Sequence, residues 1–225
     1  NPVNVATHLG SYEQLDGDAQ AAVAEAIHAL AIRWPEDDQI AIAASLLARL
    51  GKDWKLAESL IRPVLERSPE DIRAVMLWTQ LMIDQSSESP FTLLAKTVAA
   101  YPDNQELRLQ YARLLGSERD YASAQIHFSI LLERVPDNSE LLSTAALLDF
   151  ELEYFDAALQ KFQQLITLEA RLDEANYYIG RIEMGRDRYP EAIEAFAAVG
   201  PSREFRDAKA RASQLLIETA FAHDI

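Results

Sequence analysis

The sequence lacks cysteine entirely and contains only 7 glycines among its 225 residues. Without cysteine the chain has no disulfide, no thiolate metal ligand and no cysteine nucleophile. Long apolar runs are also missing. No stretch approaches the ~20 residues needed to span a bilayer, so we expect no direct membrane insertion by this segment. The few glycines form no phosphate-binding loop.

Positive charge is scarce as well. The chain has 21 Lys and Arg against 36 Asp and Glu, which gives a formal net charge of −15. Phosphate backbones and anionic membrane surfaces repel such a protein, so we predict no nucleic-acid partner. Hydrophobic residues nevertheless make up 49% of the chain, which is enough to build a packed core.

A proline followed by acidic residues recurs at a nearly constant interval. Four segments share this feature: RWPEDDQ (33–39), RSPEDIR (67–73), AYPDNQE (100–106) and RVPDNSE (134–140). Their prolines are separated by 34, 33 and 34 residues, and a further 34 reaches Ala170 in LEARLDE, where the acids remain. Self-similarity at this period predicts stacked supersecondary units rather than one globule.

Between the prolines, apolar residues follow the helical period. In ELRLQYARLL (106–115), Leu107, Tyr111 and Leu114 share one face. A short polar break precedes a second amphipathic run, YASAQIHFSILLERV (121–135). Each period therefore holds two helices of about 13 residues, each roughly 20 Å long. We predict that the two helices pack as an antiparallel hairpin.

The proline and the acids act at the junctions between these units. Proline cannot continue the preceding helix because it lacks an N–H. The Asp, Asn or Ser that follows can cap the next helix, and neighbouring acids interact favourably with the positive end of its dipole. The acidic triplet at 36–38 could instead be catalytic or bind calcium, but capping explains the acids at every junction.

Two further patterns recur in register with the prolines. The first helix of a pair has a small residue at one position: Ser45, Ala112, Ala146 and Gly180. The second helix has an Ala, a large apolar residue four positions later and another apolar residue three further on: Ala57, Ile61 and Val64; Ala124, Phe128 and Leu131; Ala158, Phe162 and Leu165; Ala192, Phe196 and Val199. Together with the period, these positions resemble the tetratricopeptide repeat (TPR) family over about 18–222.

The resemblance implies an all-α fold, an α-solenoid of antiparallel helix hairpins (a TPR superhelix) with about five repeats plus terminal helices. We expect a single array over 1–225: an unpaired first helix at 18–34, helix-pair repeats at 37–69, 70–102, 104–136, 138–170 and 172–200, and a terminal helix at 203–222. The repeat at 70–102 departs from the family pattern. It has Thr79 at the small position, Pro90 in place of the Ala, and a polar linker at 85–89.

In the TPR family the first helices line a concave groove that binds a partner, which implies a set of binding residues here. They are Arg49, Arg73, Met76, Gln80, Leu109, Arg113, Leu147, Phe150, Tyr177 and Arg181. Arginine beside aromatic residues and Met is typical of partner-binding surfaces. We expect an extended or helical segment of a protein or peptide partner, held by apolar anchors and by arginine contacts to carboxylates.

Structural interpretations of this surface stay open. Met76, Leu109 and Leu147 could serve only to pack against neighbouring helices. Each arginine could simply pair with an acid one turn away on its own helix. Some TPR proteins clamp the C-terminal carboxylate of chaperones with Lys and Asn residues on consecutive first helices. That set is missing here, so we do not expect chaperone-tail recognition.

Nothing in the sequence points to catalysis or to a cofactor. His8, His28, His127 and His223 are scattered and show no metal-ligand spacing. We therefore expect a non-catalytic scaffold or adaptor that needs no metal or cofactor. One alternative is a TPR fragment of a larger envelope protein or enzyme that acts as a targeting element, which the unpaired first helix favours. Another is a self-assembling element that forms homo-oligomers.

The compartment follows only from the resemblance. Cysteine-free acidic TPR arrays are similar to bacterial envelope adaptors, including lipoproteins that hold a peptidase or an assembly machine. This implies a bacterial periplasmic or envelope-associated location, with the cytoplasm as the alternative.

Overall fold

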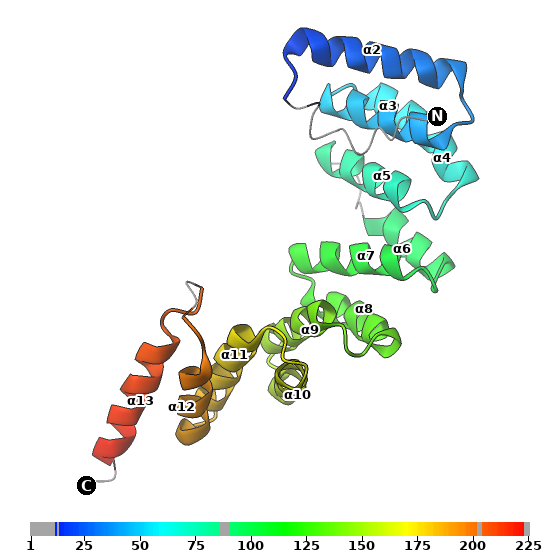
Figure 1. The fold of residues 1–225 in the computed structure, drawn as a ribbon. Coiled ribbons are helices and arrows are strands. Elements are labelled where there is room, and N and C mark those ends of the chain that lie inside the picture. The colour runs from blue at the N-terminus through cyan, green and yellow to red at the C-terminus, as the bar shows by residue number, and fades with distance from the viewer. Residues whose placement is uncertain (1–11, 13, 86–90, 202–203, 223–225) are drawn as a thin grey trace. The chain divides into compact units, whose positions relative to one another are not determined.

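A computed structural model describes residues 12, 14–85, 91–201 and 204–222. Across these residues the regular elements are helices and no strand occurs, so the predicted all-α solenoid of helix hairpins is confirmed. In chain order (Figure 1) the helices are α2 (Gly17–Arg33), α3 (Asp38–Leu50), α4 (Trp54–Arg67), α5 (Ile72–Asp84), α6 (Phe91–Ala100), α7 (Gln105–Ser117), α8 (Tyr121–Arg134), α9 (Ser139–Glu151), α10 (Phe155–Thr167), α11 (Leu172–Gly185), α12 (Tyr189–Ala198) and α13 (Ala208–Ala222).

The chain divides into two compact units, Asn1–Leu107 and Arg108–Ile225. In the first unit α2 packs on α3, and the hairpins α3–α4 and α5–α6 follow. In the second unit α8 packs on α9, the hairpins α9–α10 and α11–α12 follow, and α13 packs on α12. Each helix therefore depends mainly on its neighbours in the sequence.

Side chains at the junctions cap the helix starts, as the sequence predicts. Oδ1 of Asp37 accepts hydrogen bonds from the backbone N–H groups of Gln39 and Ile40, at 3.0 and 3.1 Å. Oδ1 of Asn138 likewise accepts hydrogen bonds from the backbone N–H groups of Glu140 and Leu141 in α9, at 3.1 and 3.0 Å. The capping role of these junction residues is confirmed, and it satisfies N–H groups that have no partner inside the helix.

The core of each hairpin consists of the large second-helix residues and the small first-helix residues that face them. The recurring phenylalanines are at most 2% exposed: Phe128, Phe162 and Phe196. Ser45 of α3 is fully buried, and its Oγ donates to the carbonyl oxygen of Ala57 in α4 at 2.7 Å. Phe196 approaches Gly180 so closely that a Cβ there would lie 2.7 Å from the ring. Small residues at these positions allow the paired helices to approach one another.

The terminal helix starts later than the predicted residue 203. Residues 204–207 form a turn, and α13 begins at Ala208. Phe205 explains the difference, because it is only 9% exposed and belongs to the same buried cluster as Ala192 and Phe196. An aromatic anchor in the connection, which the helical period did not reveal, precedes the helix.

Several expectations concern residues outside the described ranges. They include the linker at 85–89 beyond Gln85, Pro90, His8 and His223. Within those ranges, none of the helices combines the length and the apolar character that crossing a bilayer requires.

Candidate partner-binding surface

Arg49 of α3 reaches the next first helix. Its Nε donates to Oδ2 of Asp84 in α5 at 2.6 Å. Gln80, one turn earlier on α5, donates from Nε2 to Oδ1 of the same carboxylate at 3.4 Å. The hydrogen bond from Arg49 lowers the pKa of Asp84, so this carboxyl group stays ionised at neutral pH. Arg49 and Gln80, both predicted to bind a partner, therefore both donate hydrogen bonds to Asp84 of the same chain.

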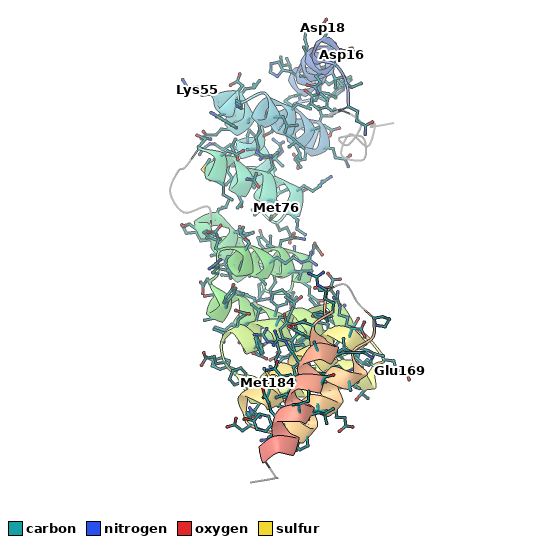
Figure 2. The ribbon with its side chains drawn as sticks, turned by 90° about the vertical axis from the view of Figure 1, so that its left-hand side faces the viewer. Asp16, Asp18, Lys55, Met76, Glu169 and Met184 are labelled. Atoms are coloured by element: carbon teal, nitrogen blue, oxygen red, sulfur yellow. The ribbon has the colours of Figure 1, made fainter. Side chains whose placement is uncertain are left out.

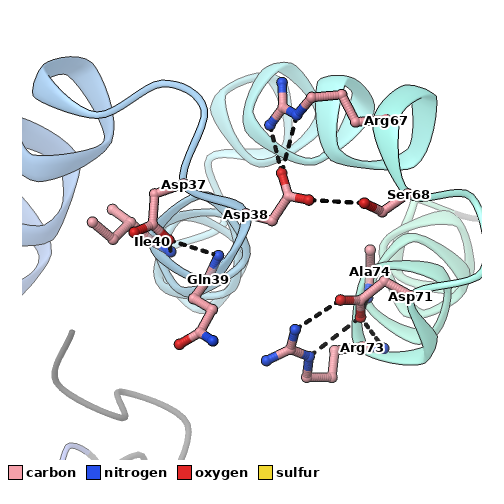
Figure 3. A network of polar contacts seen from close by, with 9 residues as sticks. All are labelled: Asp37, Asp38, Gln39, Ile40, Arg67, Ser68, Asp71, Arg73 and Ala74. Atoms are coloured by element: carbon pink, nitrogen blue, oxygen red, sulfur yellow. Dashed lines mark hydrogen bonds and ion pairs between the residues drawn. The ribbon is translucent and has the colours of Figure 1, made fainter. Parts of the chain in front are cut away.

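Arg73 lies at the start of α5 and turns back to the cap of its own helix. Its Nη2 donates to Oδ2 of Asp71 at 2.7 Å, while Oδ1 of Asp71 accepts from the Arg73 backbone N–H (Figure 3). Burial acts to raise the pKa of Asp71, but the hydrogen bonds from Arg73 and from the helix start outweigh it and lower the pKa. Arg73 therefore makes a local pair with the capping acid two residues before it rather than with an acid one turn away on its helix.

A hollow of about 630 Å³ lies beside Arg73 in the first unit. It is lined by Arg33, Trp34, Pro35, Glu36, Asp37, Asp38, Gln39, Asp71 and Arg73. Of the ten predicted binding residues, only Arg73 contributes to it. The guanidinium carbon of Arg33 lies 4.9 Å from the centre of the Trp34 ring, so these two residues cover one another.

A junction acid at this end of the first unit has a second role that the sequence analysis missed. Asp38 accepts a hydrogen bond from Nη2 of Arg67 at 2.6 Å and another from Oγ of Ser68 at 3.0 Å (Figure 3). These bonds tie the start of α3 to the end of α4. The sequence signal is weak, because the partners lie 29 and 30 residues apart.

In the second unit, hydrogen bonds to a junction acid also join the start of a hairpin to its end. Nε2 of Gln164 at the end of α10 donates to Oδ1 of Asp137, just before α9, at 3.1 Å. The backbone N–H of Gly200 donates to Oδ1 of Asp173, near the start of α11, at 2.7 Å. A junction acid thus joins the two ends of one repeat in each case.

Arg113 of α7 pairs with an acid on the next first helix. Its Nη2 donates to Oε1 of Glu140 in α9 at 3.0 Å, where Arg113 is 48% and Glu140 64% exposed. Exposed ion pairs of this kind contribute about 0–1 kcal/mol. Arg113 can therefore exchange this acid for another carboxylate at little cost.

Arg181 of α11 is held by aromatic rings. Its guanidinium carbon lies 4.6 Å from the centre of the Phe150 ring in α9 and 5.6 Å from that of Tyr178 in α11. The two rings meet edge to face, with centroids 5.1 Å apart. All three side chains are half-buried. Of these, Tyr178 was not among the predicted binding residues.

Tyr177 continues this aromatic cluster toward α13. Its ring centroid lies 4.8 Å from that of Phe205, and the guanidinium carbon of Arg211 lies 5.8 Å from the Tyr177 ring. Nε of Arg211 in turn donates to Oδ2 of Asp207 at 2.7 Å. The structure thus brings Phe150, Tyr177 and Arg181 together, and adds Arg211, which the repeat pattern could not supply because α13 follows an irregular connection.

The aliphatic members of the predicted set are half-buried: Met76, Leu109 and Leu147. Leu147 packs against the buried cluster of α9, α10 and α11 that includes Phe162. It therefore contributes to packing, in addition to any contact that its exposed part makes.

Comparison with known proteins bears on the fold. No protein-family model matches the sequence, and no curated protein matches it. Solved structures do resemble it. MamA from AMB-1 is 19% identical, with a TM-score of 0.57 over 77% of this chain and 96% of its own. PilW, a widely conserved type IV pilus biogenesis factor, is 13% identical, with a TM-score of 0.51 over 84% of this chain and 90% of its own.

At these identities the likeness is one of fold, and it agrees with the helix pairs and the 34-residue period described above. The chain has the tetratricopeptide-repeat fold. A tetratricopeptide repeat protein from Parabacteroides merdae is also similar, at 16% identity and a TM-score of 0.46 over 95% of this chain and 86% of its own.

A buried polar network inside the TPR array was missed by the sequence analysis. Asp149 of α9 is completely buried, and its Oδ2 accepts a hydrogen bond from Nζ of Lys161 in α10 at 2.6 Å. Its Oδ1 accepts from Nε2 of Gln125 in α8 at 3.0 Å. One carboxylate therefore links three TPR helices. A buried ion of this kind is tolerated only because its partners are present.

A second polar contact, between Arg108 and His127, joins the two helices of the TPR hairpin α7–α8. Nη1 of Arg108 lies 3.2 Å from Nδ1 of His127, and the His127 ring meets the Tyr111 ring with centroids 4.9 Å apart. Burial first, and the positive charge of Arg108 second, lower the pKa of His127. His127 is thus a structural histidine. Among the described residues, no three His, Cys, Asp or Glu side chains gather in a way that could hold a metal ion.

Proposed function

We propose that this TPR chain is a non-catalytic scaffold that binds a segment of a protein or peptide partner through its first helices. The supporting observation is the cluster of Phe150, Tyr177, Tyr178 and Arg181 on α9 and α11, which we call the aromatic-arginine cluster. Its members are half-buried, so each retains exposed surface on a fixed support. Tyr and Arg are among the residues enriched at binding hot spots.

The predicted set also includes an exposed arginine in each of the two units. Arg113 and Arg73 are exposed, and their ion pairs with Glu140 and Asp71 contribute little to stability. Rim charges of this type steer an approaching partner more than they hold it. In the first unit, Arg49 and Gln80, which already share Asp84, position α3 against α5.

A location in the bacterial envelope accords with this role. PilW, which has a similar fold, is a type IV pilus biogenesis factor. We propose that this chain likewise serves an assembly or adaptor task in the envelope, where partners must be held side by side.

Affinity capture from extract of the source cells tests the scaffold proposal. The wild-type chain is compared with an Arg113→Glu/Arg181→Glu variant and with a control, Lys55→Glu, at an exposed position of α4 (Figure 2). We expect a protein that wild type and control retain and the double variant loses, with equal melting temperatures for all three. Equal capture by all three baits would place the binding surface elsewhere.

Self-association is a second candidate function. Leu216 and Ile217, two neighbouring apolar residues of α13, are 54% and 57% exposed, and contiguous exposed apolar surface is typical of protein–protein contacts. Sedimentation over a range of concentrations tests this candidate. A mass that rises with concentration in wild type, and stays that of the monomer in Leu216→Lys/Ile217→Lys, is the expected result. A monomer at every wild-type concentration would exclude it.

A further inference from the structure

Arg181 differs from the other arginines predicted on the first helices. Arg49, Arg73 and Arg113 each make an ion pair with a carboxylate, at 2.6, 2.7 and 3.0 Å. Within the described part of the chain, Arg181 makes contacts to two aromatic rings and no ion pair. It is therefore the member of the predicted set whose N–H donors are not already taken by an acid of the protein.

Two acids near Arg181, Asp207 and Glu174, are occupied by other groups. Asp207 pairs with Arg211 at 2.7 Å. Glu174 accepts from Oγ of Ser143 at 2.6 Å and from Nη1 of Arg171 at 3.1 Å. The pKa of Asp207 is lowered, first by the hydrogen bond from Arg211 and to a smaller extent by the charge of Arg181. The positive charge of Arg181 thus acts on this part of the surface without being neutralised in a direct pair.

The rings also restrict the position of the Arg181 guanidinium group. Its carbon lies over the rings of Phe150 and Tyr178, and no carboxylate among the described residues makes an ion pair with it, so its N–H donors can meet a ligand. A guanidinium group restricted in this way loses less conformational freedom on binding than a flexible one. A planar fork of N–H donors is complementary to a carboxylate, which accepts two parallel hydrogen bonds.

We propose that Arg181 is a receptor for the side-chain carboxylate of an Asp or Glu in the bound segment, with an apolar residue beside it contacting Phe150 and Tyr177. This rests on the proposed scaffold function and specifies the partner: an internal acidic residue next to an apolar one. The proposal also explains how a chain with a net charge of −15 can take up an acidic segment, because the guanidinium group of Arg181 supplies a positive charge that is not neutralised by a direct ion pair within the described residues.

The test uses a library of random 12-residue peptides attached through their C termini, so that no free terminal carboxylate is present. Three proteins are probed: wild type, Arg181→Gln and the control Lys55→Gln, at an exposed position of α4. We expect wild type and control to select peptides with Asp or Glu next to an apolar residue. Changing that acid to Asn or Gln should weaken wild-type binding by roughly tenfold or more, as expected for loss of a charge-assisted bond.

The same change of the peptide should matter less than about twofold for Arg181→Gln, because the receptor group is already gone. An Arg181→Lys variant, which keeps the charge but not the planar fork, should fall between the two. If Arg181→Gln loses stability, the Arg181→Lys variant still tests the proposal.

Three outcomes would contradict the inference. If selected peptides carry no acid yet lose binding to Phe150→Ala, the scaffold proposal stands and the role of Arg181 is wrong. If amide substitution costs the same in wild type and Arg181→Gln, the carboxylate is bound elsewhere. If no peptide is enriched on any of the proteins, the scaffold proposal fails and the inference fails with it.

Discussion

A residue in the left-handed region stands in the turn of four helix hairpins, and none of the four is glycine. They are Lys52, Arg119, Glu153 and Asp187, with φ of 61°, 65°, 60° and 59°. The last three follow one another at the 34-residue period, so the conformation belongs to the repeat. In one such turn, the N–H of Tyr154 donates to the carbonyl oxygen of Asp149 at 2.8 Å and closes the end of α9.

Replacing Glu153 by Gly should stabilise the protein. A residue with a Cβ is strained at positive φ, whereas Gly adopts this conformation freely, so we expect a gain of about 0.5–1 kcal/mol. The free energy of unfolding in urea measures it. Glu194→Gly in the middle of α12 is the control and should lose about 1 kcal/mol. A loss in both variants would show that the turn does not require this conformation in solution.

The stability of the hairpin α7–α8 should depend on pH through His127. Its pKa is lowered in the native state, so the unfolded chain binds a proton at higher pH than the native chain does. Stability is therefore present above the ordinary histidine pKa of about 6.5 and is lost as pH falls from there toward the native pKa. We expect the advantage of wild type over His127→Gln to shrink between pH 7.5 and 5.5.

This window is separate from that of the carboxylates. Asp71, Asp84 and Asp207 have lowered pKa values, so their contributions are present above the ordinary value of about 3.9 and are lost only below it. Urea unfolding at pH 7.5, 6.5 and 5.5 thus isolates the histidine. A wild-type advantage that does not change over this range would contradict the assignment.

Between elements, the fit of a small residue against a large one decides how closely two helices pack. We expect Gly180→Ala in α11 to destabilise the protein by about 1–3 kcal/mol, because its Cβ would overlap the buried ring of Phe196. Gly116→Ala in α7 is the matched control. No atom lies within 4 Å of a Cβ at that position, so the change should be neutral or stabilising. Thermal melting of both variants tests the helix register; a neutral Gly180→Ala would contradict it.

The elements were predictable because they depend on local chemistry. Proline, the capping acids and the apolar period lie within one helix and its ends. Helices such as α8 and α11 could therefore be predicted from the sequence alone. The arginine partners were not predictable in this way. Arg49 meets Asp84, which lies 35 residues away, and Arg113 meets Glu140, 27 residues away.

Such pairs depend on how one hairpin is rotated against the next, which no local pattern encodes. The same holds for Asp149, which looks like an ordinary surface acid until α8 and α10 cover it. The aromatic residues around Arg181 and α13 were predicted only in part. Phe150 and Tyr177 occupy groove positions of the TPR pattern, whereas Phe205 stands in an irregular turn.

In the whole molecule, contacts between sequence neighbours should make stability a local property. Interfaces between adjacent helices dominate in α3–α4, α9–α10 and α11–α12 alike. Repeat arrays of this kind unfold with limited coupling between distant repeats. We expect Gly180→Ala to lower amide hydrogen-exchange protection in α11 and α12 while leaving α3 and α4 unchanged. A uniform loss across all helices would instead indicate a single cooperative unit.

The acids that tie the two ends of a hairpin together have a consequence for how such a chain can change length. Asp38, Asp137 and Asp173 each bond to the far end of their own repeat, so the last polar contact of a repeat is made inside it. A gene segment encoding residues 137–170 would include both partners of the hydrogen bond between Asp137 and Gln164 when it is duplicated or deleted. The proline-acid junctions are therefore natural points for duplication, and an array could gain or lose a binding position without redesign of its neighbours.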